Sequence, residues 1–174
     1  PVNETLDLTT NKPISKESIQ SKLAAAQGPK KVEFFKVKTG EGVEMDGWMV
    51  KPKNFDPSKK YPVVFFVYTE PASQTVTDRY GIGSNRLYKG DMAEDGYIYI
   101  SLDSRGTPAP KGRTWRKSIY KKVGLLNVAD QAAGAKEIMK WSFVDPERVA
   151  VWGWSGGGTT TLHLMFQYPD IYKT

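Results

Sequence analysis

The sequence contains no cysteine and a single histidine among its 174 residues. The lack of cysteine excludes disulfide bridges, thiolate nucleophiles and cysteine-ligated metal sites, and it suits a cytosolic protein as well as an exported bacterial one. The longest wholly apolar run, Val63 to Val67, is far shorter than the roughly 20 residues that span a bilayer, and no signal region opens the chain. The sequence therefore predicts no membrane span, no metal and no other cofactor.

The charge is unevenly distributed, with a net value of +6 from 25 basic and 19 acidic residues. Much of the basicity falls between Lys111 and Lys122, where Trp115 and Tyr120 alternate with the cations. Such a mixture can bind nucleic acid, but no nucleic-acid motif accompanies it. A solvated basic loop, or a loop facing an acidic partner domain, is the favoured interpretation, and no nucleic-acid function is predicted.

The stretch VAVWGWSGGGTTTLHL, residues 149–164, passes from a β-branched apolar segment through a glycine-rich turn into a helix-compatible run. Ser155 stands at the apex, flanked by Gly153 and Gly157 in the pattern G-x-S-x-G. Glycine is required there because strand and helix come too close for a Cβ atom. The pattern predicts a nucleophile elbow, in which the N–H of Gly156 faces developing negative charge. The alternative is a glycine-rich turn with a bystander serine.

Alternation and composition predict an α/β fold, with a mostly parallel sheet preceded by an antiparallel hairpin. The hairpin strands are expected at 32–38 and 43–50, and the buried strands at 63–68, 97–103 and 148–154. Helices are expected at 14–27, 84–94 and 125–141. Residues 1–30 are predicted to be a connecting segment with a short helix, and residues 31–174 a catalytic domain.

Three further residues follow from this layout. Tyr68 lies at the carboxyl end of a buried strand, and in open α/β sheets ligands bind outside the carboxyl ends, where Ser155 also emerges. Arg105 and Asp130 either form a partly buried ion pair beneath the loops or are independent surface charges.

A serine nucleophile needs a general base, and after Ser155 the only histidine is His163 and the only acid is Asp170. His163 lies eight residues down the same helix, about 12 Å along its axis, so its imidazole cannot reach Ser155. The sequence therefore predicts a fold truncated after the nucleophile helix. It also predicts an unpaired outer edge on the nucleophile strand, which favours self-association.

Four segments of the sequence together resemble the α/β-hydrolase domain of the prolyl oligopeptidase family, most closely its dipeptidyl peptidase IV branch. These segments are GWMVKPKNFDPSKKYPVVFFVY, EPASQTVTD, SLDSRGT and FVDPERVAVWGWSGGG. The resemblance implies that Ser155 is the nucleophile and that the Gly156 N–H and the Tyr68 hydroxyl form the oxyanion hole. The sequence departs from that branch in two places. Gly156 replaces a common tyrosine, and Thr69-Glu70-Pro71 replaces a sequence richer in small residues.

The resemblance also implies a longer protein, called the parent protein below, that releases N-terminal dipeptides after proline or alanine from a peptide substrate. Its β-propeller would precede Pro1, and its acid and histidine would follow Thr174, so the 174-residue chain alone is expected to be inactive. The resemblance allows a homodimer and favours an exported, for example periplasmic, bacterial protein. An esterase or acyl transferase on the same scaffold stays open, as does a non-catalytic binding module that uses residues 111–122.

Overall fold

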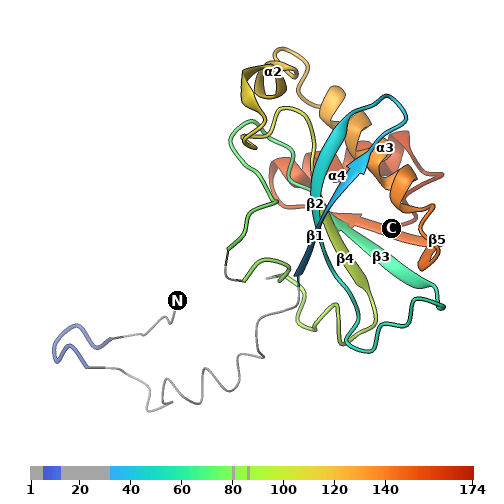
Figure 1. Cartoon of the computed structure of the whole chain (residues 1–174). Helices are drawn as coiled ribbons and strands as arrows, with labels where there is room; N and C mark the ends of the chain where they lie inside the picture. The colour runs from blue at the N-terminus through green and yellow to red at the C-terminus, as the bar shows by residue number, and fades with distance from the viewer. Residues whose placement is uncertain (1–5, 13–31, 80, 86) are drawn as a thin grey trace.

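The computed structural model describes residues 6–12, 32–79, 81–85 and 87–174, and it shows one twisted sheet with helices beside it (Figure 1). The helix predicted over residues 14–27 lies outside the described residues. The strands are β1 (Val32–Lys38), β2 (Glu44–Val50), β3 (Tyr61–Phe66), β4 (Ile98–Asp103) and β5 (Val144–Trp152). The helices are α2 (Gly112–Lys117), α3 (Leu126–Ile138) and α4 (Gly156–Gln167). In the described part of the chain, no helix has the length and apolar character needed to cross a membrane.

The sheet has the strand order β1-β2-β4-β3-β5, and it is mixed rather than mostly parallel. β3 is parallel to both β4 and β5, whereas β1 with β2 and β2 with β4 are antiparallel. The prediction of a mostly parallel sheet is wrong because β2 does more than complete a hairpin. It hydrogen-bonds directly to the central strand β4, with Trp48 opposite Ser101.

Both faces of the sheet are covered, but by different kinds of structure. α3 and α4 contact each other and bury one face, with a core of Val63, Phe65, Ile98, Ile100, Val128, Ala132, Ala135 and Leu164. The opposite face is covered by the connection between β3 and β4, and its core contains Trp48, Val64, Met92 and Tyr99.

The helix predicted over 84–94 is absent from the described residues of that connection, which form turns. The reason is local competition from polar side chains. Asn85 accepts hydrogen bonds from the backbone N–H groups of Leu87 and Tyr88, and Asp91 accepts one from the N–H of Ala93. The turns closed in this way give these backbone N–H groups hydrogen-bond partners without an α-helix.

β5 is the last strand in the sheet order, yet its outer edge is not unpaired as predicted. The N–H of Lys173 donates to the carbonyl of Val149 at 2.8 Å, and the N–H of Val151 donates to the carbonyl of Thr174 at 2.8 Å. These bonds are possible because the chain returns from α4 through Ile171 and Tyr172, both fully buried. Lys173 and Thr174 therefore pair with the carboxyl-terminal half of β5.

An ion pair joins the loop after β4 to α3. The Arg105 side chain donates to both carboxylate oxygens of Asp130, with Nη2 at 2.6 Å from Oδ1 and Nε at 2.9 Å from Oδ2. The backbone N–H of Arg105 also donates to Asp130, at 3.0 Å. The carboxylate side chain is only 4% exposed, so this fork is the partly buried pair that the sequence left as one of two interpretations. The hydrogen bonds from Arg105 to Asp130 raise the pKa of the guanidinium above its ordinary value.

We expect Asp130→Asn to lower the free energy of unfolding by about 1.5–3 kcal/mol, because it removes the charge that satisfies three donors of Arg105 in a partly buried site. Urea unfolding of the chain, followed by tryptophan fluorescence, measures this loss. The matched control is Glu44→Gln, which neutralises the exposed pair with Lys36 and should leave the unfolding midpoint unchanged. Equal midpoints for the two variants would contradict a structural role for the fork.

Candidate active site

Ser155 lies in a strained turn between β5 and α4. Its backbone has φ 54° and ψ −120°, a conformation that non-glycine residues rarely adopt, and α4 begins at the next residue, Gly156. The Ser155 residue is exposed to solvent. A strained serine that ends a strand and begins a helix has the geometry of a nucleophile elbow.

The glycines on either side of Ser155 are required by close backbone contacts. A Cβ on Gly153 would collide with the backbone of Gly157 and would lie 2.6 Å from the carbonyl oxygen of Val67. A Cβ on Gly157 would collide with the same Val67 carbonyl. The glycine spacing therefore reflects the packing of the end of β3 against the elbow, which is a specific form of the steric reason expected from the sequence.

Tyr68 emerges at the same edge of the sheet as Ser155. Phe66 and Trp152 are paired at the ends of β3 and β5, and the N–H of Val67 donates to the carbonyl of Trp152 at 3.0 Å. The half-buried Tyr68 ring packs near the start of α4, where its Cδ2 would lie 3.2 Å from a Cβ on Gly157. The tyrosine, the serine and the first N–H groups of α4 thus gather at one place.

A buried polar cluster fixes the loop that carries Tyr68. The Thr69 hydroxyl lies 3.1 Å from the hydroxyl of Thr160 on α4, and the Asn127 amide on α3 donates to the carbonyl and the hydroxyl of Thr69. Thr160 in turn donates to the carbonyl of Gly156. This cluster connects the loop, α3 and α4, and it was not predicted from the sequence. The available signal was Asn127, a polar residue between Leu126 and Val128 near the start of α3.

A second polar cluster holds the far end of the same loop. The Asp103 carboxylate accepts hydrogen bonds from the N–H of Thr75 at 2.8 Å and the N–H of Val76 at 3.2 Å, and the Thr75 hydroxyl donates to it as well. Ser101 donates to the carbonyl of Phe66 and lies 2.7 Å from the Thr75 hydroxyl. Burial raises the pKa of the Asp103 carboxyl, and the hydrogen bonds from Thr75 and Val76 partly oppose that rise. The loop from Tyr68 to Val76 is therefore anchored at both ends.

Glu70 occupies the space directly above Gly156. A Cβ on Gly156 would collide with the carboxylate of Glu70, which is half-buried. Among the described residues, this carboxylate has no hydrogen-bond or ion-pair partner. Glu70 and Gly156, which belong to the two places where the sequence departs from the branch that it resembles, are thus in contact, and a side chain at position 156 would have to displace the Glu70 carboxylate.

His163 lies on α4, where its Nδ1 is 3.0 Å from the Nε2 of Gln167, one turn further along the helix. This is the helix-face position predicted from its spacing. Since it is the only histidine in the sequence, no imidazole of this chain serves Ser155.

Residues 89–174 match the profile of the prolyl oligopeptidase family. Among curated relatives, dipeptidyl peptidase 4 of Trichophyton equinum is 35% identical over 147 residues, covering 84% of this chain and 19% of that protein. Dipeptidyl peptidase 4 of Arthroderma otae is 36% identical over 151 residues, with coverage of 87% and 19%. The crystal structure of Porphyromonas gingivalis dipeptidyl peptidase 4 superposes with a TM-score of 0.76 at 35% identity, over 93% of this chain and 22% of that one. The chain spans about a fifth of the length of these relatives.

We expect Gly157→Ala to destabilise the chain by about 2 kcal/mol or more, because the added methyl group meets the backbone of Val67, which cannot rotate away. The control is Gly158→Ala, one residue further along α4. There the nearest atom to a new Cβ is the carbonyl oxygen of Gly153 at 3.4 Å, so stability should change by less than about 1 kcal/mol. Urea unfolding of both variants separates the two cases, and similar losses would refute the close-packed elbow.

Proposed function

Since this chain belongs to the prolyl oligopeptidase family and is similar to its dipeptidyl peptidase IV branch, we propose that it is the nucleophile-bearing part of a serine peptidase. The parent protein releases dipeptides from the N-terminus of peptides, after proline or alanine. The observation that carries the assignment of the nucleophile is the strained, exposed Ser155 at the elbow, with Tyr68 at the same sheet edge.

In the proposed reaction, the Ser155 oxygen attacks the carbonyl carbon of the second substrate residue, while a histidine outside this chain accepts the hydroxyl proton. The electron pair of the carbonyl π bond moves to its oxygen, and the Gly156 N–H and the Tyr68 hydroxyl donate to that oxyanion. When the oxyanion collapses, the C–N bond breaks and the histidine returns its proton to the leaving amine. Water then hydrolyses the acyl ester on Ser155 and frees the dipeptide.

The remaining parts of the machinery belong to the longer parent protein under this proposal. An acid and a histidine that follow residue 174 supply the general base, and a β-propeller that precedes residue 1 restricts access to short peptides. The parent protein is an exported bacterial enzyme in this proposal. The elbow alone does not choose between an amide and an ester substrate, so the support for a peptidase comes from the relatives rather than from the turn.

In the parent protein, Tyr68→Phe should lower kcat on a chromogenic Xaa-Pro substrate by roughly 10²-fold, because the lost hydroxyl donates to charge that is present only in the transition state. KM and the thermal midpoint should change little. Tyr120→Phe is the matched control, since Tyr120 is 72% exposed and belongs to the basic stretch rather than to the elbow. Unchanged turnover of the Tyr68 variant would remove this residue from the oxyanion hole.

The 174-residue chain alone should show no turnover of the same substrate. Its Ser155 hydroxyl has no imidazole within reach, and the loss of one triad member costs on the order of 10⁴ to 10⁶ in kcat. The chain and its Ser155→Ala variant should therefore give the same background rate. A rate above that of the variant would show that another group in this chain acts as the base.

A further inference from the structure

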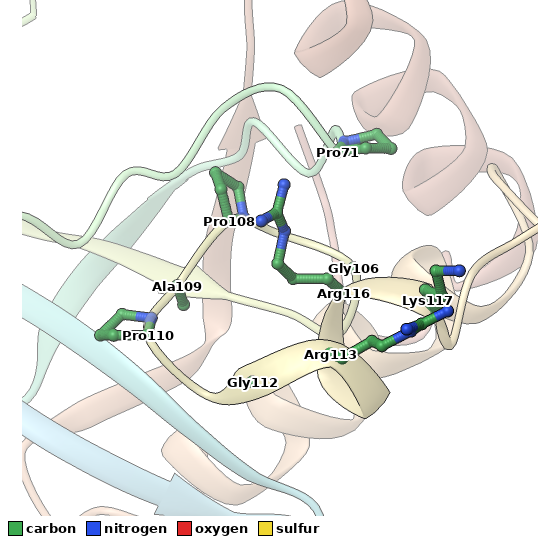
Figure 2. Close-up of a pocket in the computed structure, with 9 residues that line it drawn as sticks. All are labelled: Pro71, Gly106, Pro108, Ala109, Pro110, Gly112, Arg113, Arg116 and Lys117. Atoms are coloured by element: carbon green, nitrogen blue, oxygen red, sulfur yellow. The ribbon is translucent and has the colours of Figure 1, made fainter.

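A pocket of about 610 Å³ lies between the loop that follows Tyr68 and the α2 region (Figure 2). Its lining residues are Pro71, Gly106, Pro108, Ala109, Pro110, Gly112, Arg113, Arg116 and Lys117. Figure 2 shows Pro71 on one side and the strand-to-helix loop with α2 on the other, and Arg116 extends from α2 toward Pro71 and Pro108. The pocket is therefore formed by two separate segments of the chain.

Hydrogen bonds and packing hold the α2 side of the pocket in shape. The N–H of Gly106 donates to the carbonyl of Trp115 at 3.0 Å, and the Trp115 indole donates to the Thr107 hydroxyl at 3.3 Å. Gly106 has φ 96°, and a Cβ there would collide with Ile119. Arg105, directly before it, is fixed by Asp130. The wall that carries the cations is thus anchored to α3 and to the sheet before any ligand binds.

The cations of the pocket have no partner among the described residues. Arg113, Arg116 and Lys117 form no ion pair or side-chain hydrogen bond there, whereas Lys111, on the same basic stretch, is 3.1 Å from the Asp46 carboxylate and lies over the Trp115 ring. These three cationic side chains are the charged groups of the pocket lining, and the two guanidinium groups match a carboxylate best.

The pocket is connected to the site of the proposed reaction through the loop that carries Pro71. Pro71 directly follows Glu70, whose carboxylate lies over Gly156, the residue after the nucleophile. Two extended residues of a bound peptide span roughly 7 Å. A peptide that continues past Ser155 on the Glu70 side would bring a group within one to three residues of the scissile bond toward Pro71 and the pocket.

We propose that Arg113, Arg116 and Lys117 bind a carboxylate on the part of the peptide that leaves as the amine, C-terminal to the scissile bond. This inference rests on the proposed function. The released dipeptide carries the substrate's N-terminal ammonium, which three cations repel. The leaving portion continues the chain, so it can present an aspartate or glutamate side chain or, in a tripeptide or tetrapeptide, its terminal carboxylate.

The test uses the full-length parent protein and matched peptides. Gly-Pro-Ala-Glu-amide is compared with Gly-Pro-Ala-Gln-amide for a side-chain carboxylate, and Gly-Pro-Ala acid with Gly-Pro-Ala amide for a terminal one. We expect kcat/KM to be about 10-fold higher for the carboxylate member of at least one pair, through KM, because the contact is the same in the ground state and the transition state. High salt should reduce this preference.

Variants of the basic side chains test whether the preference for a carboxylate arises in the pocket. Arg116→Gln should reduce it, and the triple change of Arg113, Arg116 and Lys117 to glutamine should abolish it. Lys122→Gln is the control, because Lys122 is an exposed cation of the same stretch that does not line the pocket, and this variant should keep the preference. Gly-Pro-p-nitroanilide, which has no carboxylate, should be cleaved equally by all four proteins.

Results that contradict the pocket assignment differ from results that contradict the proposed function. Equal kcat/KM within both peptide pairs, or a preference that survives the triple change, would overturn the pocket assignment while cleavage of the p-nitroanilide still supports the peptidase. No cleavage of any of these substrates by the wild-type parent protein would overturn the proposed function, and the pocket assignment with it.

Discussion

The close approach of the Val67 carbonyl to Gly153 and Gly157 is the contact on which the candidate site depends. It forces glycine at both positions and lets α4 begin immediately above the end of β3. Because β3 and β5 are parallel neighbours, their carboxyl ends lie side by side, and the same approach brings Tyr68 next to the start of α4. The strain at Ser155 is therefore maintained by packing, not by the turn itself.

A carbonyl so close to another backbone needs a rigid loop, and buried polar side chains supply that rigidity. Asn127, Thr69 and Thr160 connect three elements beneath the elbow, and Asp103 holds the loop again at Thr75. In a dry interior, a satisfied network specifies one arrangement, because every alternative leaves a donor or acceptor unpaired. The apolar core fixes where the sheet and helices lie, and these hydrogen bonds fix the position of the loop that carries Tyr68.

The features that were predictable from sequence have a local cause. G-x-S-x-G has a steric reason, VVFFV reads as a buried strand because it lacks polar alternation, and the spacing of His163 from Ser155 already excluded it as the base. Partners distant in sequence were not predictable. Nothing near Trp48 indicates that it pairs with Ser101, and Thr69 looked like one residue of an unusual loop. The helix predicted over 84–94 fails for a local reason. The composition of this segment suits a helix, but Asn85 and Asp91 accept backbone hydrogen bonds that form turns.

Glu70 and Gly156 show how two departures from the branch can be a single structural change. Their contact means that a larger side chain at position 156 would have to displace the carboxylate, and the absence of a Cβ at Gly156 is what gives Glu70 its place. A glutamate side chain turns by rotation about its own torsions, whereas a backbone neighbour such as Val67 cannot yield. The side chain that fills the space beside Gly156 can therefore vary, while the contacts of Gly153 and Gly157 with the Val67 carbonyl stay fixed. Variation in the side chain beside Gly156 is thus separated from the packing that holds Ser155.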